Sequence, residues 1–476
     1  MLLLALIALP VLAAAVAYTL ASDRQRPVVL PVAAAGHLVL ALAAISSRGP
    51  SSLAGWLALD PPGRLVLLLL SSLFAICAVY AVGYLRYRRE ISNRVFVPCL
   101  LGFLGMTTLV VCSQHLGLMW VGVEAATLTT APLIYFNRTP RSIEATWKYL
   151  LVGSVGIALA LLGSFFLAYA SLGEDSSLLF ADLLRRAHQM DRSWLRAAFV
   201  LLLVGYGTKM GLAPMHTWKP DAYGEAPGVV GALLAGGLTS CAFLALVRVF
   251  HICAAAGEGA YASRLLVFFG LLSIAIAAVF MVGQRDFKRM LAYSSIEHMG
   301  LLVLGVGLGG SGVFASMLHM LNNGMTKGVL FLSAANIHRA FDSKSIDQVR
   351  GAMRRVPLSG TLFLFGFFAI TGSPPFGPFL SEFLIVSRAF AADRVLVAGG
   401  VLLLLLVVFV GMGRTVLAVV QGLPSPEAER TRYQDGLLTG LPVVIAMAVV
   451  LLLGLHIPSP LEAMLRDAAA YLERIP

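Results

Sequence analysis

Apolar runs long enough to cross a lipid bilayer recur along this chain from its first residue almost to its last. A helix needs about 20 apolar residues to span the hydrocarbon. We therefore predict an all-α, polytopic membrane protein with about fourteen transmembrane helices. The predicted spans are 1–20, 27–46, 65–85, 95–113, 115–136, 146–170, 196–214, 228–253, 263–283, 290–309, 312–337, 357–387, 395–421 and 437–456.

The composition agrees with this class. Hydrophobic residues make up 59% of the 476 residues and charged residues only 12%, against about 25% charged residues in an ordinary soluble domain. The first span, Met1 to Leu20, lacks a basic start and is followed at once by Arg24, Arg26 and another apolar run. We therefore interpret it as a retained helix rather than a cleaved signal peptide.

The connections between spans exclude several kinds of chemistry. They are too short for a nucleotide- or flavin-binding domain, which needs about 50 residues or more. The five cysteines lie inside apolar segments and have no C-x-x-C spacing, which argues against zinc and iron–sulfur sites. We expect no cofactor and no metal in this chain, and any redox or ATP chemistry must lie on another chain. The net charge of +11 belongs to short loops at the membrane, so we expect no nucleic-acid partner.

Lysine and arginine residues concentrate in alternate connections. Examples are the connections at 86–94 after the third span, 285–289 after the ninth and 339–355 after the eleventh. Basic loops face the cytoplasm. This predicts a multi-pass protein of the inner (cytoplasmic) membrane with both termini on the outer side.

Ionisable residues inside the spans are the strongest pointers to function, because a charge at membrane depth is costly and normally faces a bundle interior or a water-filled path. Glu124 lies in the fifth span, Lys209 in the seventh and Glu382 in the twelfth. The eleventh span carries polar residues at separations of three, four and eight, which places them on one helical stripe. These are His319, Asn322, Asn323, Thr326 and Lys327.

Prolines break two of the spans. Pro214 in the seventh frees the carbonyl of Met210, and Pro374 and Pro375 in the twelfth free carbonyls near Ile370. Broken helices at corresponding places in two halves are typical of inverted-repeat transporters. A buried lysine near a glutamate can gain or lose a proton as their separation changes, since burial disfavours both charged forms and proximity favours them.

Structural roles are the alternative for each residue taken alone. One buried Lys or Glu can belong to a structural ion pair, but four such residues spread over four spans favour a relay. His298 is equally compatible with helix packing and with proton transfer, whereas its place on the stripe favours transfer for His319. Arg248, near the end of a span, is expected to extend its guanidinium to the membrane interface.

These motifs resemble the antiporter-like subunits of respiratory complex I, membrane-bound hydrogenases and Mrp-type sodium/proton antiporters. The resemblance covers essentially the full chain. It rests on Trp120–Glu124, Lys209, His216–Ala222, Glu225–Pro227, Lys288–Ser295, and His319 with Lys327. Within the family, Glu144–Leu150 and Ser373–Phe383 look most like component F of hydrogenase-4.

The resemblance implies two inverted five-helix repeats whose seventh and twelfth helices are broken. The chain would then divide into 1–94 with the first three helices, 95–256 with the first repeat, 263–421 with the second repeat, and 422–476 with a loop, the last helix and a short tail.

The resemblance also implies a proton path. It would begin at Glu124 paired with Lys209, continue through Lys327 and leave at Glu382. His298 and His319 would connect these residues, and Lys148 falls where the family tends to carry a polar or basic residue. Residues expected to line the path or break its helices are Pro214, Ser240, Asn323, Pro374 and Pro375.

The sequence departs from the family at two places that matter for this path. Many members place a lysine in the eighth helix to link the two half-channels, where this chain has Ser240. The loop after the first break has Lys219 where a leucine is usual and Tyr223 where a histidine is usual. The missing lysine puts the continuity of the path in doubt, because a serine cannot carry the charge.

The sequence thus predicts a proton-translocating, antiporter-like subunit of a redox-driven complex, of the group 4 membrane-bound hydrogenase or formate hydrogenlyase type. Its partners would be other membrane subunits, through them a peripheral hydrogenase or dehydrogenase arm, and the lipid bilayer. Two alternatives remain open: a sodium/proton antiporter subunit of Mrp type, and a non-conducting membrane scaffold for a peripheral catalytic arm.

Overall fold

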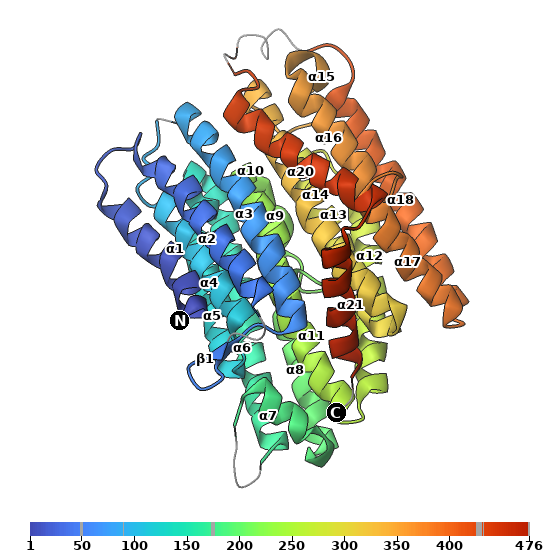
Figure 1. Ribbon diagram of the computed structural model, residues 1–476. Helices are drawn as coiled ribbons and strands as arrows, with labels where there is room; N and C mark the ends of the chain where they lie inside the picture. The colour runs from blue at the N-terminus through green and yellow to red at the C-terminus, as the bar shows by residue number, and fades with distance from the viewer. Residues whose placement is uncertain (48–50, 89, 173–176, 425–430, 432, 475–476) are drawn as a thin grey trace.

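A computed structural model describes residues 1–47, 51–88, 90–172, 177–424, 431 and 433–474. Most of these residues lie in helices that pack side by side into one elongated bundle (Figure 1). Among the described residues the only strands are β1(Ser51–Ser52) and β2(Leu57–Ala58), a short antiparallel pair. The predicted all-α class is confirmed.

The helices follow one another with short connections. The first part of the chain forms α1(Leu2–Thr19), η1(Arg26–Val28), α2(Val29–Ser46), α3(Pro61–Tyr87), α4(Phe96–Cys112), α5(Leu116–Ile134), η2(Tyr135–Asn137), α6(Pro140–Ala170), α7(Phe180–Arg185), η3(Ala187–Gln189) and α8(Arg192–Met210). The remainder forms α9(Trp218–Glu225), α10(Gly228–Leu233), the π-helical η4(Leu234–Leu238), α11(Thr239–Ala255), α12(Gly259–Val282), α13(Phe287–Leu308), α14(Ser311–Phe341), α15(Ala352–Arg355), α16(Pro357–Ile370), α17(Gly377–Ala391), α18(Val395–Val420), α20(Leu437–Leu455) and α21(Ser459–Glu473).

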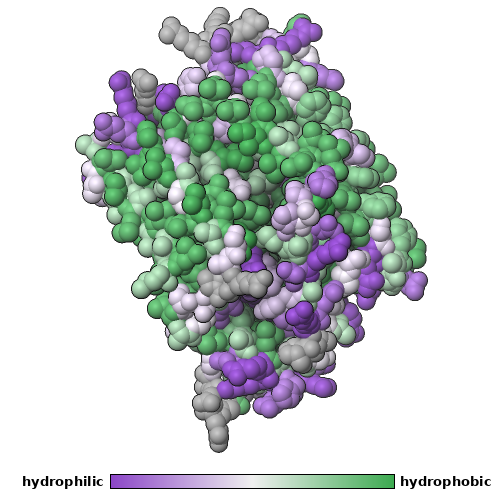
Figure 2. Space-filling view, in the orientation of Figure 1, coloured by the Kyte–Doolittle hydropathy of each residue, from purple (hydrophilic) through white to green (hydrophobic). Residues whose placement is uncertain are grey.

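Ten helical segments of the described chain are long and apolar enough to cross a bilayer, and α4 and α16 are shorter apolar helices. α8, which carries Lys209, and α14, which carries His319 and Lys327, account for the remaining predicted spans. Hydrophobic residues cover much of the face over α2, α3 and α20, whereas hydrophilic residues gather at its upper edge and lower end (Figure 2). All fourteen predicted spans therefore contain helix, as expected of a polytopic membrane protein.

Both predicted helix breaks are confirmed. α8 ends at Met210, and Gly211 adopts the left-handed conformation, at φ 78°, that commonly caps a helix. α9 begins only at Trp218. The twelfth span is likewise divided into α16 and α17, with Gly372 at φ 66° in the connection. The division into two inverted repeats stays a prediction.

The most deeply buried helices are α10 to α11, α13 and α14. The apolar windows of Gly228–Ala255 and Phe287–Leu308 are 100% buried inside the protein. α14 packs against α3, α10, α13, α16, α17 and α20. The polar stripe predicted on the eleventh span therefore faces protein on all sides rather than lipid.

The segment after the last predicted span is more ordered than the predicted short tail. It forms α21, which packs against α3, α11 and α14 and buries Leu465, Ala468 and Leu472. At the end of α20, Gly454 lies directly against the backbone of Pro375 and Phe376. The C-terminal helices therefore cover the second helix break.

Arg248 contradicts the expectation that it reaches the membrane interface. It is 3% exposed, and its Nε and Nη2 donate to the two carboxylate oxygens of Asp60, each at 2.8 Å. Asp60 also accepts from the Gly63 amide as the N-cap of α3. A buried guanidinium with a carboxylate partner has no reason to extend to the interface, so the expectation was wrong.

Candidate functional site

Glu124 of α5 and Lys209 of α8 lie next to each other. The Lys209 Nζ is 3.7 Å from Glu124 Oε2 and donates to Thr127 Oγ1 at 2.7 Å. Lys209 is fully buried, whereas the Glu124 side chain keeps 20% of its exposure. Since 3.7 Å exceeds hydrogen-bond length, the hydroxyl of Thr127 fixes the ammonium while the carboxylate remains an unbonded ion-pair partner.

Glycines on α6 provide the space for Lys209. A Cβ at Gly153 would lie 2.8 Å from Lys209 Nζ, and one at Gly156 would lie 2.6 Å from the Cβ of Thr208. The ring of Tyr149, also on α6, has its centroid 5.8 Å from Lys209 Nζ. Helix α8 can therefore pack closely along α6 and hold the lysine between α5 and α6.

Lys327 occupies the centre of the bundle, on α14. It is fully buried, and its Nζ donates to Ser294 Oγ on α13 at 2.7 Å. Glu297 lies three residues farther along α13, on the same helix face as Ser294. Glu297 is 1% exposed, and its Oε2 has no hydrogen-bond partner among the described residues. α13 thus presents a hydroxyl and a carboxyl group to the central lysine.

His298, His319 and Glu382 form one buried cluster contributed by α13, α14 and α17. His298 Nδ1 lies 3.0 Å from His319 Nε2 and 3.9 Å from Glu382 Oε1. The other ring nitrogen of His319, Nδ1, is 2.9 Å from Ser381 Oγ. The two predicted connectors and the predicted exit residue therefore lie together.

The same three residues could hold a metal ion, because their ligand atoms all lie within 4.8 Å of one another. Imidazole and carboxylate groups are common zinc ligands. The contact of 3.0 Å between the two imidazoles is also hydrogen-bond length, so the geometry already suits proton transfer. The absence of a metal site stays a prediction.

Carbonyl groups at the two breaks are met by polar side chains. At the break that contains Pro214, the Met210 carbonyl accepts a hydrogen bond of 2.6 Å from Lys219 Nζ. At the end of the break that contains Pro374 and Pro375, the Gly377 carbonyl accepts a hydrogen bond of 2.7 Å from Asn322 Nδ2. Unpaired backbone groups at membrane depth are tolerated where protein groups meet them in this way.

Ser240 and Asn323, the other predicted path residues, have different surroundings. Ser240 lies just after η4, and its Oγ donates to the Gly236 carbonyl of its own helix at 2.6 Å. Asn323 is 1% exposed, and both polar atoms of its amide have no hydrogen-bond partner among the described residues. Asn323 therefore offers free polar atoms to the interior, whereas the Ser240 hydroxyl is already engaged.

The connection between α14 and α15 marks one end of the bundle, which we call the α15 end. Lys148 lies there, apart from the buried residues, because it lines a cavity with Glu225, the partner of Lys344 in that connection. Its side chain is 47% exposed, and its Nζ lies 2.6 Å from Glu144 and 2.9 Å from Asp221. Together with Arg141 and Arg289 these residues line a polar cavity of about 270 Å³. Lys148 thus lines a cavity at the surface of the protein and is not part of its interior.

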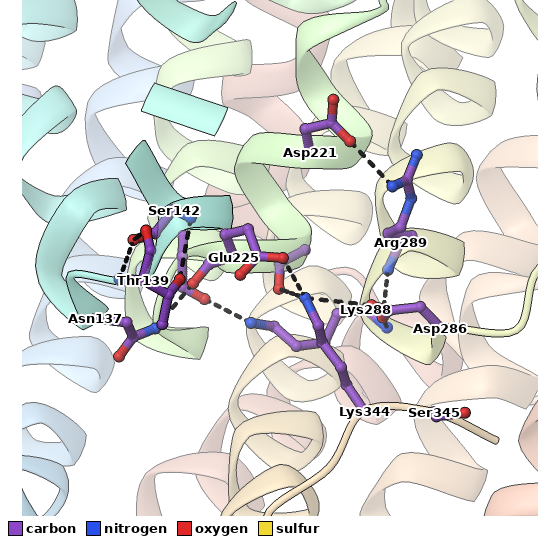
Figure 3. Close-up of polar contacts among 12 residues, drawn as sticks. Asn137, Thr139, Ser142, Asp221, Glu225, Asp286, Lys288, Arg289, Lys344 and Ser345 are labelled. Carbon is purple, nitrogen blue, oxygen red and sulfur yellow. Dashed lines mark hydrogen bonds and ion pairs between the residues drawn. The ribbon is translucent and has the colours of Figure 1, made fainter. Parts of the chain in front are cut away.

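An ion-pair network spans the same end (Figure 3). Lys344 Nζ lies 2.6 Å from Glu225 Oε1 and 3.3 Å from Asp286 Oδ2, and Arg289 Nη1 lies 3.1 Å from Asp221 Oδ1. Glu225 and Asp221 belong to α9, Arg289 to α13, and Lys344 to the connection after α14. The network therefore joins the helix after the first break to the second half of the chain.

Lys219 and Glu297 are buried ionisable residues that sequence reasoning did not assign to the path. Glu297 had a usable signal, since it is a carboxylate inside a predicted span and next to His298. Lys219 follows Pro214 in what looked like a connection. Its burial became apparent only when α9 was seen to fold back into the bundle.

These residues together form a buried series of amines, carboxyl groups and imidazoles. Several of their atoms have no hydrogen-bond partner among the described residues, including Glu124 Oε2, Glu297 Oε2, His298 Nε2 and Glu382 Oε1. Buried polar groups normally have partners, so these atoms remain open to a further hydrogen bond.

Comparisons with known proteins agree with this arrangement. The sequence profile described as "NADH:quinone oxidoreductase/Mrp antiporter, TM" matches residues 113–410. The chain is 35% identical to a hydrogenase-4 component F homolog of Methylacidiphilum infernorum, covering 84% of this chain and 87% of that protein. It is 31% identical to NADH-quinone oxidoreductase subunit N of Desulforudis audaxviator, covering 79% and 75%. A chain of the Mrp complex from Dietzia sp. has the same fold, with a TM-score of 0.88 at 21% identity, covering 99% and 98%.

Proposed function

The chain belongs to the NADH:quinone oxidoreductase/Mrp antiporter membrane family, and on that premise we propose that it moves protons across the membrane within a redox-driven complex. It is an antiporter-like membrane subunit of the kind found in complex I, hydrogenase-4 and Mrp complexes. The observation that carries the proposal is the buried series of titratable groups, from Glu124 and Lys209 to Lys327 and then to Glu382, which passes both helix breaks.

The Glu124–Lys209 pair would act as the switch. When the carboxylate is close it favours the charged ammonium, and when the two move apart the buried amine loses that support and releases its proton. The present separation of 3.7 Å leaves room for movement in either direction. A structural change in a partner subunit is therefore enough to alter proton affinity at Lys209.

The second half of the path would receive the proton at Lys327. Glu297 can take it from the Lys327 ammonium, and the His298–His319 pair can pass it towards Glu382. Moving one charge against 100 mV takes about 2.3 kcal/mol, so the complex must supply redox energy. The redox centres would lie in a peripheral hydrogenase or dehydrogenase arm rather than in this chain.

The similarity to a hydrogenase-4 component F homolog favours a group 4 membrane hydrogenase as the parent complex. Other membrane subunits would bind this chain, and the basic connections at the α15 end would face the cytoplasm. Lys148 and its cavity would then take up protons from that side, and both termini would lie on the outer side of the inner membrane.

The experiment is redox-driven proton uptake by vesicles that contain the intact complex, with Lys209→Ala and Glu382→Gln compared with the wild type. Assembly is checked on native gels. Proton uptake per electron should fall at least about tenfold in both variants, while electron transfer continues uncoupled or slows. Uptake at the wild-type level in both variants would mean that the chain is a membrane scaffold and that its buried charges are structural.

A sodium/proton antiporter subunit is the second candidate. The Mrp complex shares the fold, and the second break gathers oxygen atoms suited to a hard cation. These include Glu382 Oε1 and Asn322 Oδ1, which have no hydrogen-bond partner among the described residues. If sodium shares the path, proton movement by the vesicles will depend on sodium concentration with the redox reaction held constant.

A further inference from the structure

We propose that Lys219 carries the proton between the two halves of the chain, in place of the lysine that Ser240 replaces. This inference rests on the proposed proton-transfer function and names the residue that makes the path continuous. Three features of the structure lead to it: the engagement of Ser240, the burial of Lys219 without an ion pair, and the contacts of Lys219 with the end of α8 and, through Tyr223, with α14.

Ser240 does not supply the link. Its hydroxyl hydrogen bonds to the Gly236 carbonyl of its own helix at 2.6 Å, and it is 2% exposed. A serine bound to its own helix is an ordinary local arrangement. It also cannot hold a proton as a charge, so the connection must come from another element.

Lys219 lies against the first break, at the end of α8, the helix that carries Lys209. Its Nζ donates to the carbonyl of Met210, the residue directly after Lys209, at 2.6 Å. A Cβ at Gly211 would lie 3.1 Å from the same Nζ. The Lys219 amine therefore occupies the space that the end of α8 and the left-handed turn at Gly211 leave open.

The opposite side of Lys219 faces the second half of the chain. The ring of Tyr223 contacts the ring of Phe331, which lies one turn after Lys327 on α14, with the ring centroids 5.5 Å apart. The ring of Tyr223 lies beneath the amine, with its centroid 5.5 Å from Nζ. Lys219 thus reaches α14, the helix of the central lysine, through the Tyr223 ring, while its hydrogen bond reaches the end of the helix that carries Lys209.

Lys219 is 0% exposed, and no carboxylate of the described residues lies within ion-pair distance of it. A buried ammonium without a counter-ion is costly, and in membrane proteins such residues mark ion or proton paths. The neutral amine still carries N–H donors, so its bond to the Met210 carbonyl survives the loss of a proton. Lys219 can therefore change its charge without losing its position.

We propose that one proton passes along the three lysines in two steps. The Lys209 ammonium gives one proton to the neutral Lys219 amine and becomes an amine itself. The Lys219 ammonium then gives that proton to the neutral amine of Lys327. Because a charge on Lys219 repels a charge on Lys327, Lys219 accepts its proton only after Lys327 has passed its own proton on, so the two steps follow one another.

A structural alternative is that Lys219 only caps helix α8, since a cation stabilises a helix C-terminus. The substitution that separates the two roles is Lys219→Arg. Arginine keeps the positive charge and the hydrogen-bond donors but does not release its proton in a protein. Lys219→Gln removes the charge and keeps one donor for the Met210 carbonyl.

Lys288→Gln is the matched control. Lys288 is also a buried lysine, 2% exposed, and its Nζ also donates to a backbone carbonyl, that of Ala226, at 2.6 Å. This bond caps the end of α9, at the α15 end and away from the proposed link. Lys288→Gln therefore measures the effect of losing a buried lysine–carbonyl bond alone.

The variants are compared in vesicles that contain the intact complex, by proton uptake per electron transferred. We expect both Lys219→Arg and Lys219→Gln to lower the ratio at least about tenfold, with Lys288→Gln close to the wild type. If the complex that carries Lys219→Gln fails to assemble, the coupling ratio of Lys219→Arg alone tests the proposal. Wild-type coupling in Lys219→Arg would overturn the proposal and leave Lys219 as a helix cap.

Lys209→Ala, measured in the same preparation, distinguishes a failure of the Lys219 proposal from a failure of the proposed function. Coupling that is lost in Lys209→Ala but kept in Lys219→Arg would retain the proposed function and reject Lys219 as the link. Coupling kept in both variants would reject the proposed function itself.

Discussion

His298 Nδ1 and His319 Nε2 lie 3.0 Å apart in the buried space between α13 and α14. At this distance one ring donates a hydrogen bond to the other. The second ring nitrogen of His319, Nδ1, lies 2.9 Å from Ser381 Oγ on α17. Glu382 Oε1 lies 3.9 Å from His298. The two histidines thus contact each other and lie beside Glu382, as the proposed path requires.

If the histidines act in series, either His298→Gln or His319→Gln alone should interrupt the path. Each single variant should lower proton uptake per electron on the order of tenfold. The double variant should be little worse than the poorer single one, because effects of residues that act as a unit do not add. Effects that multiply in the double variant would instead indicate two separate routes.

Glu297→Gln tests the carboxyl group that the structure adds to the path. Glutamine has nearly the same shape but cannot take a proton from the Lys327 ammonium, which is bound to Ser294 on the same face of α13. Proton uptake per electron should fall at least about tenfold while the complex still assembles. The measurement is vesicle acidification during turnover, and unchanged acidification would place Glu297 outside the path.

Gly372→Ala should displace Glu382. A Cβ at Gly372 would collide with the Glu382 carboxylate, and the backbone there has φ 66°, which a residue with a side chain adopts with strain. We expect coupling to fall about as far as in Glu382→Gln, which the same vesicle assay measures.

The control for Gly372→Ala is Gly399→Ala. At this position in α18 a Cβ would meet nothing within 4 Å, and alanine favours a helix over glycine. Gly399→Ala should therefore couple like the wild type. Normal coupling in Gly372→Ala itself would show that Glu382 tolerates displacement from its present position.

Glu124→Gln should make Lys209 insensitive to the movement of α5. The amide cannot support the ammonium by charge, so the proposed switch loses its partner while the bond from Lys209 to Thr127 remains. Coupling should decrease on the order of tenfold, as measured by the ratio of protons to electrons. Glu462→Gln, which neutralises a 39% exposed carboxylate on α21, should leave this ratio unchanged.

Asp60→Asn tests stability rather than transfer. It leaves the buried Arg248 guanidinium without its carboxylate, and breaking a buried pair in this way costs about 3 to 5 kcal/mol. The assembled complex should therefore dissociate at a lower temperature on native gels after heating. Protons moved per electron by the surviving complex should match the wild type, and a lower ratio would link this ion pair to transport.

The sequence by itself was enough for the membrane class, the approximate places of fourteen helices and both helix breaks. Each of these follows from a local property, either an apolar run long enough for the bilayer or a proline that cannot donate to a helix. The sequence also identified several of the buried ionisable residues, including Lys209, Lys327 and Glu382, because a charge within an apolar run is visible without knowing its partner. It did not reveal α21, whose helix depends on packing against α3, α11 and α14.

Only the tertiary structure decided which groups meet. Arg248 pairs with Asp60, which is 188 residues away, and Lys209 bonds to Thr127, which is 82 residues away. Lys219 looked like a loop residue until α9 was seen to return it to the interior beside the Met210 carbonyl. Contacts of this kind depend on how helices rotate and pack against one another, and no property of the local sequence specifies that geometry.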